Sequence, residues 1–139
     1  MSALPTTGYS GTPLPKKLGY KPSSKVLLIG APAEYKTLLG ALPEGVAFVK
    51  KAGPGVDLVH LFTVEKADLQ GELSALRKQL KADAAVWVSW PKKSAKVPTD
   101  ITEDTIREVA LPMGFVDIMV CAVNDVWSGL KLVVRKEHR

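Results

Sequence analysis

Apolar residues are concentrated in short, nearly uninterrupted runs, a pattern typical of strands that are buried on both faces of a parallel sheet. Three such runs cover residues 25–30, 57–62 and 84–90. The first run ends in Gly30 and the third is followed by Pro91, and both residue types interrupt strands. We therefore predict three strands that are covered by helices on both sides.

Two further apolar runs lie close together near the C-terminus. They cover residues 115–123 and 129–135, and only the short segment 124–128 separates them. A connection of this length is typical of a β-hairpin, so these two strands should be antiparallel. A sixth and shorter strand is predicted at residues 46–49.

Helical spacing of apolar residues fills the gaps between the strands. Residues 33–42 predict a short helix that ends before Pro43, and Asp100 with Glu103 predicts a capping box at the start of a later helix. The clearest helix follows the second apolar run, where leucines at spacings of four, three and four form one stripe. These leucines are Leu69, Leu73, Leu76 and Leu80.

The first 24 residues differ in composition from the rest and are rich in proline, glycine and small polar residues. We predict an irregular N-terminal arm at 1–24, with a short helix that begins near Thr12 and ends at Gly19. Residues 1–11 should act either as a lid over a ligand crevice or as a docked tail, and the sequence leaves both open.

The order of elements predicts the fold class. Strands alternating with helices predict a three-layer α/β fold of the Rossmann-like kind, on a mostly parallel sheet of about six strands with an antiparallel C-terminal hairpin. Residues 25–139 are the length of one domain, and 46% of the chain is hydrophobic, which suffices for one core.

Charge and composition narrow the classes of function. The net charge is +5, but the basic residues are spread along the chain in runs no longer than a pair, which argues against a nucleic-acid-binding arm. Cys121 is the only cysteine, so a disulfide or a thiolate metal site within the chain is not expected. No apolar stretch approaches the roughly 18 residues of a membrane span, and we expect a cytoplasmic protein with no membrane partner.

Three stretches together resemble the core of class I methyltransferases: residues 14–30, 57–62 and 114–136. The resemblance implies that the last strand of the hairpin inserts beside the fourth parallel strand, and that the chain is one strand and one helix shorter than the family core. The segments PTTGYSGTPL, VSWPKK and WSGLK also resemble a family of small bacterial proteins recorded only as a domain of unknown function, which implies no activity.

Two positions depart from the methyltransferase pattern. The loop after the first strand holds one glycine, Gly30, and a proline two residues later, Pro32. The second strand ends in Lys50 and Lys51 where that family has an acid. Both features argue against S-adenosylmethionine, and the absence of a G-x-G-x-x-G segment argues against nicotinamide cofactors. We predict no cofactor.

In a parallel α/β sheet, ligands bind beyond the carboxyl ends of the strands. The loops expected at that edge carry lysines, tryptophans and serines, a composition suited to a small anionic ligand with a flat or apolar part. The alternative is that Trp90 and Trp127 hold loops and the lysines are solvated. The candidate ligand-binding residues are Lys50, Lys51, Ser89, Trp90, Lys92, Lys93, Trp127 and Ser128.

No catalytic or metal-binding residue is predicted. Ser89 lacks the G-x-S-x-G context of a hydrolase nucleophile. His60 lies in the middle of a buried strand, where we expect a neutral imidazole bonded to a backbone carbonyl or a nearby side chain. Cys121 lies within a strand and should be a buried, unreactive thiol with a raised pKa.

Three functional hypotheses follow. The first is a non-catalytic ligand-binding or interaction module on a degenerate methyltransferase-like scaffold. The second is a small transferase that acts on a nucleotide or phosphorylated ligand held by the two lysine pairs. The third is weak nucleic-acid binding through residues 92–96, with Trp90 stacking on a base. Whether the protein forms a homodimer stays open.

Overall fold

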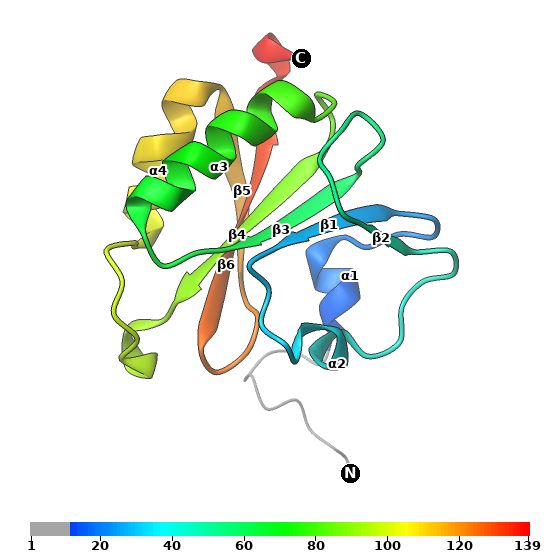
Figure 1. Ribbon diagram of the computed structural model, residues 1–139, viewed down its shortest axis with the longest axis horizontal. Coiled ribbons are helices and arrows are strands. Elements are labelled where there is room, and N and C mark those ends of the chain that lie inside the picture. The colour runs from blue at the N-terminus through cyan, green and yellow to red at the C-terminus, as the bar shows by residue number, and fades with distance from the viewer. Residues whose placement is uncertain (1–11) are drawn as a thin grey trace.

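Six strands form one mixed sheet in the computed structural model, which describes residues 12–139 (Figure 1). The strand order across the sheet is β2-β1-β3-β4-β6-β5, with β1 to β4 parallel and β6 antiparallel to both of its neighbours. The strands are β1 (Lys25–Ile29), β2 (Ala47–Val49), β3 (Leu58–Phe62), β4 (Ala85–Pro91), β5 (Phe115–Ala122) and β6 (Trp127–Val134).

Helices cover both faces of this sheet, which confirms the predicted α/β fold class. One face packs against α3 (Lys66–Gln79) and α4 (Glu103–Ala110), and the other against α1 (Leu14–Leu18) and α2 (Tyr35–Leu39). Three single turns of 3-10 helix complete the described secondary structure: η1 (Lys93–Ala95), η2 (Leu111–Met113) and η3 (Lys136–His138).

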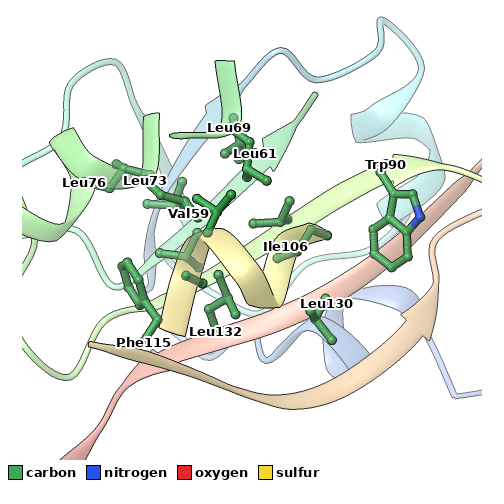
Figure 2. Packing of buried hydrophobic residues seen from close by; sticks show 14 of the residues in the cluster. Val59, Leu61, Leu69, Leu73, Leu76, Trp90, Ile106, Phe115, Leu130 and Leu132 are labelled. Atoms are coloured by element: carbon green, nitrogen blue, oxygen red, sulfur yellow. The ribbon is translucent and has the colours of Figure 1, made fainter. Parts of the chain in front are cut away.

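The apolar runs are continuous because the sheet is covered on both sides. All five residues of β3 are buried, and they alternate between the two cores. Val59 and Leu61 pack with the leucines of α3 and with Ile106 of α4, as Figure 2 shows. Leu58 and Phe62 pack on the opposite face, with α1 and α2. The leucine stripe of α3 is confirmed for Leu69, Leu73 and Leu76, which are almost fully buried, whereas Leu80 is the C-cap in an extended conformation and is half-buried.

The C-terminal hairpin enters the sheet by its second strand. β6 lies between β4 and β5, which places the last strand beside the fourth parallel strand as the methyltransferase resemblance implies. β6 begins at Trp127, two residues earlier than predicted, because the Asn124 side chain accepts hydrogen bonds from the backbone N–H groups of Val126 and Trp127 and shortens the turn. Trp127 thereby pairs with Pro91 at the end of β4.

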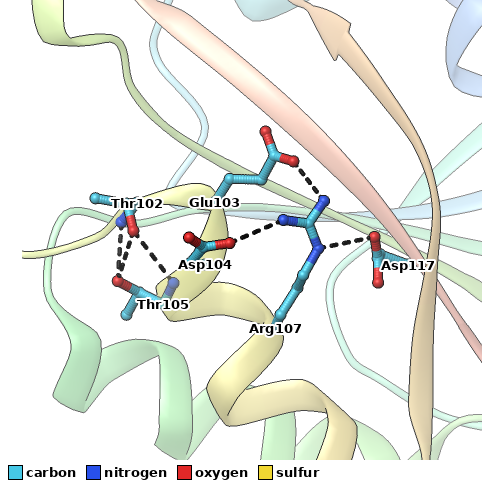
Figure 3. Close-up of polar contacts among 6 residues, drawn as sticks. All are labelled: Thr102, Glu103, Asp104, Thr105, Arg107 and Asp117. Atoms are coloured by element: carbon cyan, nitrogen blue, oxygen red, sulfur yellow. Dashed lines mark hydrogen bonds and ion pairs between the residues drawn. The ribbon is translucent and has the colours of Figure 1, made fainter.

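The capping box of α4 differs from the predicted one. Thr102 caps the helix and exchanges hydrogen bonds with Thr105, whereas Asp100 accepts a hydrogen bond from the backbone N–H of Lys66 at the start of α3. The prediction was wrong because Asp100 and Thr102 are both favourable N-cap residues, and Asp100 is instead used at the start of α3. Figure 3 shows this cap.

An arginine joins α4 to the edge of the sheet. Arg107 forms ion pairs with Glu103 and Asp104 on its own helix, and its Nε donates to Asp117 Oδ2 of β5 at 3.0 Å (Figure 3). Beyond Asp117 the edge strand is less protected, since Ile118, Met119 and Val120 are each about half exposed.

The N-terminal segment packs on the sheet from residue 14 onward. Leu14, Leu18 and Tyr20 are buried in the core that contains α1 and α2, and α1 ends at Gly19, whose φ of 90° is the predicted left-handed stop. The N-cap of α1 is Pro13 and not Thr12, with no side-chain hydrogen bond. Residues 1–11, for which a lid or a tail is predicted, lie outside the described residues. No helix between residues 12 and 139 has the length and apolar character to cross a membrane.

Candidate functional site

A pocket of about 420 Å³ lies at the carboxyl ends of β1 and β3, and we call it the carboxyl-edge pocket. Its walls come from the ends of these two strands, the loop after β3, the first turns of α3 and the first residue of β6. This is the place that a parallel α/β sheet offers to ligands, and the volume falls within the usual range of small-molecule sites. The lining residues are Ile29, Gly30, Leu61, Phe62, Thr63, Val64, Asp68, Glu72 and Trp127.

Glycine is required at the position where β1 enters the pocket. Gly30 has a φ of 69°, in the left-handed region, and a Cβ on it would lie 2.6 Å from the carbonyl oxygen of Phe62. No side chain fits at that distance from a backbone oxygen. The end of β1 therefore approaches the end of β3 closely, and backbone rather than a side chain forms this part of the pocket.

One wall of the pocket is acidic. Asp68 and Glu72 lie four residues apart on α3, so both carboxylates are on one helix face. Asp68 is exposed and Glu72 is half-buried. Within residues 12–139 neither carboxylate forms an ion pair, and no lysine or arginine lines the pocket. The electrostatic potential of the pocket therefore favours a cation over an anion.

Another part of the lining is aromatic. The ring of Trp127 meets Phe62 edge to face, with centroids 5.1 Å apart and an interplanar angle of 86°. Phe62 in turn stacks on His60 at 4.3 Å and 22° and meets Tyr35 edge to face at 5.5 Å. The Phe62 ring is therefore held by contacts with three other rings. Trp127 presents a half-buried indole to the pocket.

A chain of buried hydrogen bonds lies behind this aromatic wall. Tyr20 Oη and Tyr35 Oη are 2.8 Å apart, and Tyr35 Oη is 2.8 Å from His60 Nδ1. His60 Nε2 is 2.7 Å from Ser89 Oγ. A neutral imidazole has one N–H donor and one acceptor, so these two contacts use both of its nitrogens. His60 is thus bonded to nearby side chains, one of the two outcomes predicted for it.

Burial determines the ionisation of these groups. His60 is fully buried, and the loss of hydration lowers its pKa from 6.5 to about 3. Burial raises the pKa of Tyr20 to about 12 and raises that of Tyr35 further. The side chains of Tyr20, Tyr35 and His60 are therefore uncharged at neutral pH. Burial also raises the pKa of Cys121, but this thiol is half-buried rather than fully buried as predicted, because β5 is the edge strand.

The structure places the two predicted aromatic residues differently. Trp127 lines the carboxyl-edge pocket, whereas Trp90 is 8% exposed and packs into the core against α3 and α4. Ser89 points to the opposite face, where it is fully buried against His60. Ser128 is half-buried and pairs with Trp90 across β4 and β6.

The two predicted lysine pairs do not line the pocket. Lys50 and Lys51 are exposed at the end of β2, and Lys93 is exposed in η1. Lys92 is half-buried, and its backbone N–H donates to the carbonyl of Val126. β1 and β3 lie between β2 and β4, so the strands that carry the two pairs are about 14 Å apart. The sheet order therefore separates the pairs.

The sequence interpretation missed the acidic wall. Asp68 and Glu72 look like ordinary solvated residues of an amphipathic helix, and only their place in the first turns after a buried strand points to the carboxyl edge. Among residues 12–139, no group of three His, Cys, Asp or Glu residues is arranged to hold a metal ion.

Comparison with known proteins gives a family for this chain. The model of a family described as "protein of unknown function (DUF3052)" matches residues 50–136, which include β3 to β6 and both helices of the α3 and α4 layer. The chain belongs to the DUF3052 family. No curated protein matches the sequence of this DUF3052 chain.

Solved structures share the fold of this DUF3052 protein. A SAM dependent methyltransferase from Aquifex aeolicus has a TM-score of 0.62 at 16% identity, covering 86% of this chain and 87% of that one. A precorrin methyltransferase from Geobacter metallireducens has a TM-score of 0.56 at 12% identity, covering 88% and 85%. A fibrillarin pre-rRNA processing protein from Methanococcus jannaschii has 0.52 at 15%, covering 92% and 71%. These likenesses confirm a methyltransferase-like core and show the fold alone.

Proposed function

We propose that the protein is a non-catalytic small-molecule-binding module on a reduced methyltransferase-like scaffold. The carboxyl-edge pocket is its binding site, and its ligand combines a flat apolar part with a cationic group. The observation that carries this proposal is that the Trp127 indole and the Asp68 and Glu72 carboxylates line the same pocket. An indole face attracts both flat rings and cations, and two unpaired carboxylates add a favourable charge.

The polar groups of the pocket support binding rather than catalysis. Thr63, Asp68 and Glu72 supply the polar side chains of the lining, and none of them is hydrogen-bonded to a histidine. His60 lies behind Phe62 with both ring nitrogens engaged, and the Thr63 hydroxyl donates to the backbone carbonyl of Glu65 rather than to Asp68 or Glu72. A nucleophile activated by an adjacent base is therefore not assembled among the lining residues.

A transferase that acts on a phosphorylated ligand has less support in this pocket. A phosphate would face Asp68 and Glu72 with the same sign of charge. S-adenosylmethionine is a sharper alternative, because it carries a flat adenine and a sulfonium cation and because one protein of this fold is a SAM dependent methyltransferase. Against it stand the single glycine of the loop after β1 and the lysines that follow β2.

A charge series on one flat group tests the proposal. Calorimetry of the full chain compares adenosine, 5′-amino-5′-deoxyadenosine and AMP, which carry a neutral, a cationic and an anionic group on the same nucleoside. We expect the cationic compound to bind most tightly and AMP least. Tightest binding of AMP, or no binding of any of the three at millimolar concentration, contradicts the proposal.

Variants assign the binding to the pocket. Asp68→Asn and Glu72→Gln should weaken the cationic compound and leave adenosine unchanged, and Trp127→Ala should weaken both. Lys50→Gln is the matched control, since it changes one exposed charge outside the pocket. Titration with S-adenosylmethionine and a check for methyl transfer complete the test, because turnover would establish the transferase instead.

A further inference from the structure

A second cavity, of about 410 Å³, lies at the opposite end of the sheet, and we call it the amino-edge cavity. It is bounded by the C-terminal end of α1, by the first residues of β3 and β4, and by the last part of β6. Pro22, Ala85 and Val133 supply accessible apolar surface, and much of the rest of the lining is polar or charged. It shares no lining residue with the carboxyl-edge pocket, and none of the ligand-binding candidates from the sequence lines it.

Two lysines of this cavity have no hydrogen-bond or ion-pair partner among the described residues. Lys131 of β6 is half-buried, and its Nζ lies beside Gly19 at the end of α1, 3.2 Å from where a Cβ on that glycine would be. Lys21 follows α1 and lines the same cavity. Within residues 12–139 neither ammonium forms a hydrogen bond or an ion pair. Burial and the charge of Lys21 lower the pKa of Lys131, which shows that its charge is poorly compensated.

The two acids of the cavity lie beside a third lysine, Lys81, which lines the same cavity. Asp57 Oδ1 accepts from Lys81 Nζ at 2.5 Å, and Asp57 Oδ2 accepts from the backbone N–H of Lys25 at 2.8 Å. Asp83 is exposed, and its charge acts on Lys81. The side with Asp57, Asp83 and Lys81 thus carries a net charge of −1, while the side with Lys21 and Lys131 carries two positive charges, so the cavity as a whole is positive.

A buried hydroxyl adds a donor to the lysine side. Ser24 lines the cavity and is 7% exposed. Its Oγ accepts a hydrogen bond from the backbone N–H of Lys21 at 3.0 Å, and its own O–H is left without an acceptor in the described part of the chain. Buried donors are normally paired, so this hydroxyl indicates a missing acceptor.

We propose that the amino-edge cavity binds a phosphate monoester of a small molecule, with the phosphate held between Lys21, Lys131 and Ser24. A phosphate monoester carries close to two negative charges at pH 7, which matches the two ammonium groups. Its oxygens can accept a hydrogen bond from the Ser24 hydroxyl. Pro22, Ala85 and Val133, the partly exposed apolar residues of the lining, would contact the organic part. The volume suits a small metabolite. This site is independent of the carboxyl-edge pocket.

Titration followed by heteronuclear NMR on the full chain tests this site. The probes are glycerol 3-phosphate, inorganic phosphate and glycerol. We expect saturable shifts in residues 18–24, 57–58 and 131–133, with tighter binding of glycerol 3-phosphate than of inorganic phosphate and no effect of glycerol. Equal binding of glycerol 3-phosphate and inorganic phosphate would refute the proposal that the ligand is a phosphate monoester. Chemical-shift changes spread over all lysine-bearing surfaces would refute the proposal that the amino-edge cavity is the binding site.

Matched variants locate the charge contacts. Lys21→Gln and Lys131→Gln should each weaken glycerol 3-phosphate by about tenfold or more, since each removes a charge-assisted hydrogen bond. Lys78→Gln, on the exposed face of α3, removes the same charge elsewhere and should leave binding unchanged. Lys131→Arg keeps the positive charge, so it distinguishes the loss of the charge from a folding defect in Lys131→Gln. An equal loss in Lys78→Gln would show nonspecific attraction and refute the proposal.

Discussion

Lowering the pH from 7 to 5 should destabilise the folded protein through one side chain, His60. The imidazole is fully buried, and its pKa in the folded state is about 3, against 6.5 for an ordinary histidine. Below pH 6.5 the unfolded chain therefore binds a proton that the folded chain does not. Because the folded pKa is the lower one, stability is fully present above pH 6.5 and falls as the pH decreases toward 3.

The size of the effect follows from the two pKa values. Stability changes by about 1.4 kcal/mol per pH unit in the interval where only the unfolded state is protonated. Between pH 6.5 and pH 5 the loss is thus about 2 kcal/mol, a large fraction of the roughly 5–15 kcal/mol that stabilises a typical domain. Asp57 has a pKa lowered from 3.8 by Lys81 and the Lys25 N–H, so its effect appears only at more acidic pH.

Urea denaturation at pH 7, 6 and 5 measures this dependence. His60→Gln removes the titrating group, so its free energy of unfolding should be nearly constant over this range whatever its absolute value. Ser89→Ala removes a hydrogen-bond partner but keeps the imidazole, and should retain the slope of the wild-type protein. A flat wild-type profile, or an equal slope in His60→Gln, would refute the reasoning.

Three further predictions concern other parts of the fold. Gly30→Ala should lose about 1–3 kcal/mol of stability in urea denaturation, because of its left-handed φ and the clash with Phe62, whereas Gly53→Ala, with open space around its Cα, should not. Thr102→Ala should lose about 1 kcal/mol with the cap of α4, and restoring the cap with serine should recover most of it. Cys121 should react slowly with iodoacetamide at pH 7 and faster at pH 9, since its pKa is raised; fast reaction at pH 7 would contradict this.

The sequence by itself determined the elements that depend on one segment and its surroundings. The run at β3 is apolar throughout because both of its faces are covered, and the leucines of α3 recur at helical spacing because one face is covered. Such patterns record how many sides of a segment are buried, and they are visible without knowing what covers it. The same holds for the hairpin and for the stop of α1 at Gly19.

Tertiary structure alone decided the contacts between distant segments. His60 is bonded to Tyr35 and Ser89, which are 25 and 29 residues away, and no local pattern selects these partners. The strand order separates the lysine pairs that the sequence analysis placed around one hollow. The packing of α1 against the sheet brings Lys21 and Lys131, which are far apart in the chain, to one cavity. Local periodicity reports burial, whereas a binding site depends on the relative positions of whole elements, which are set by the packing of the complete chain.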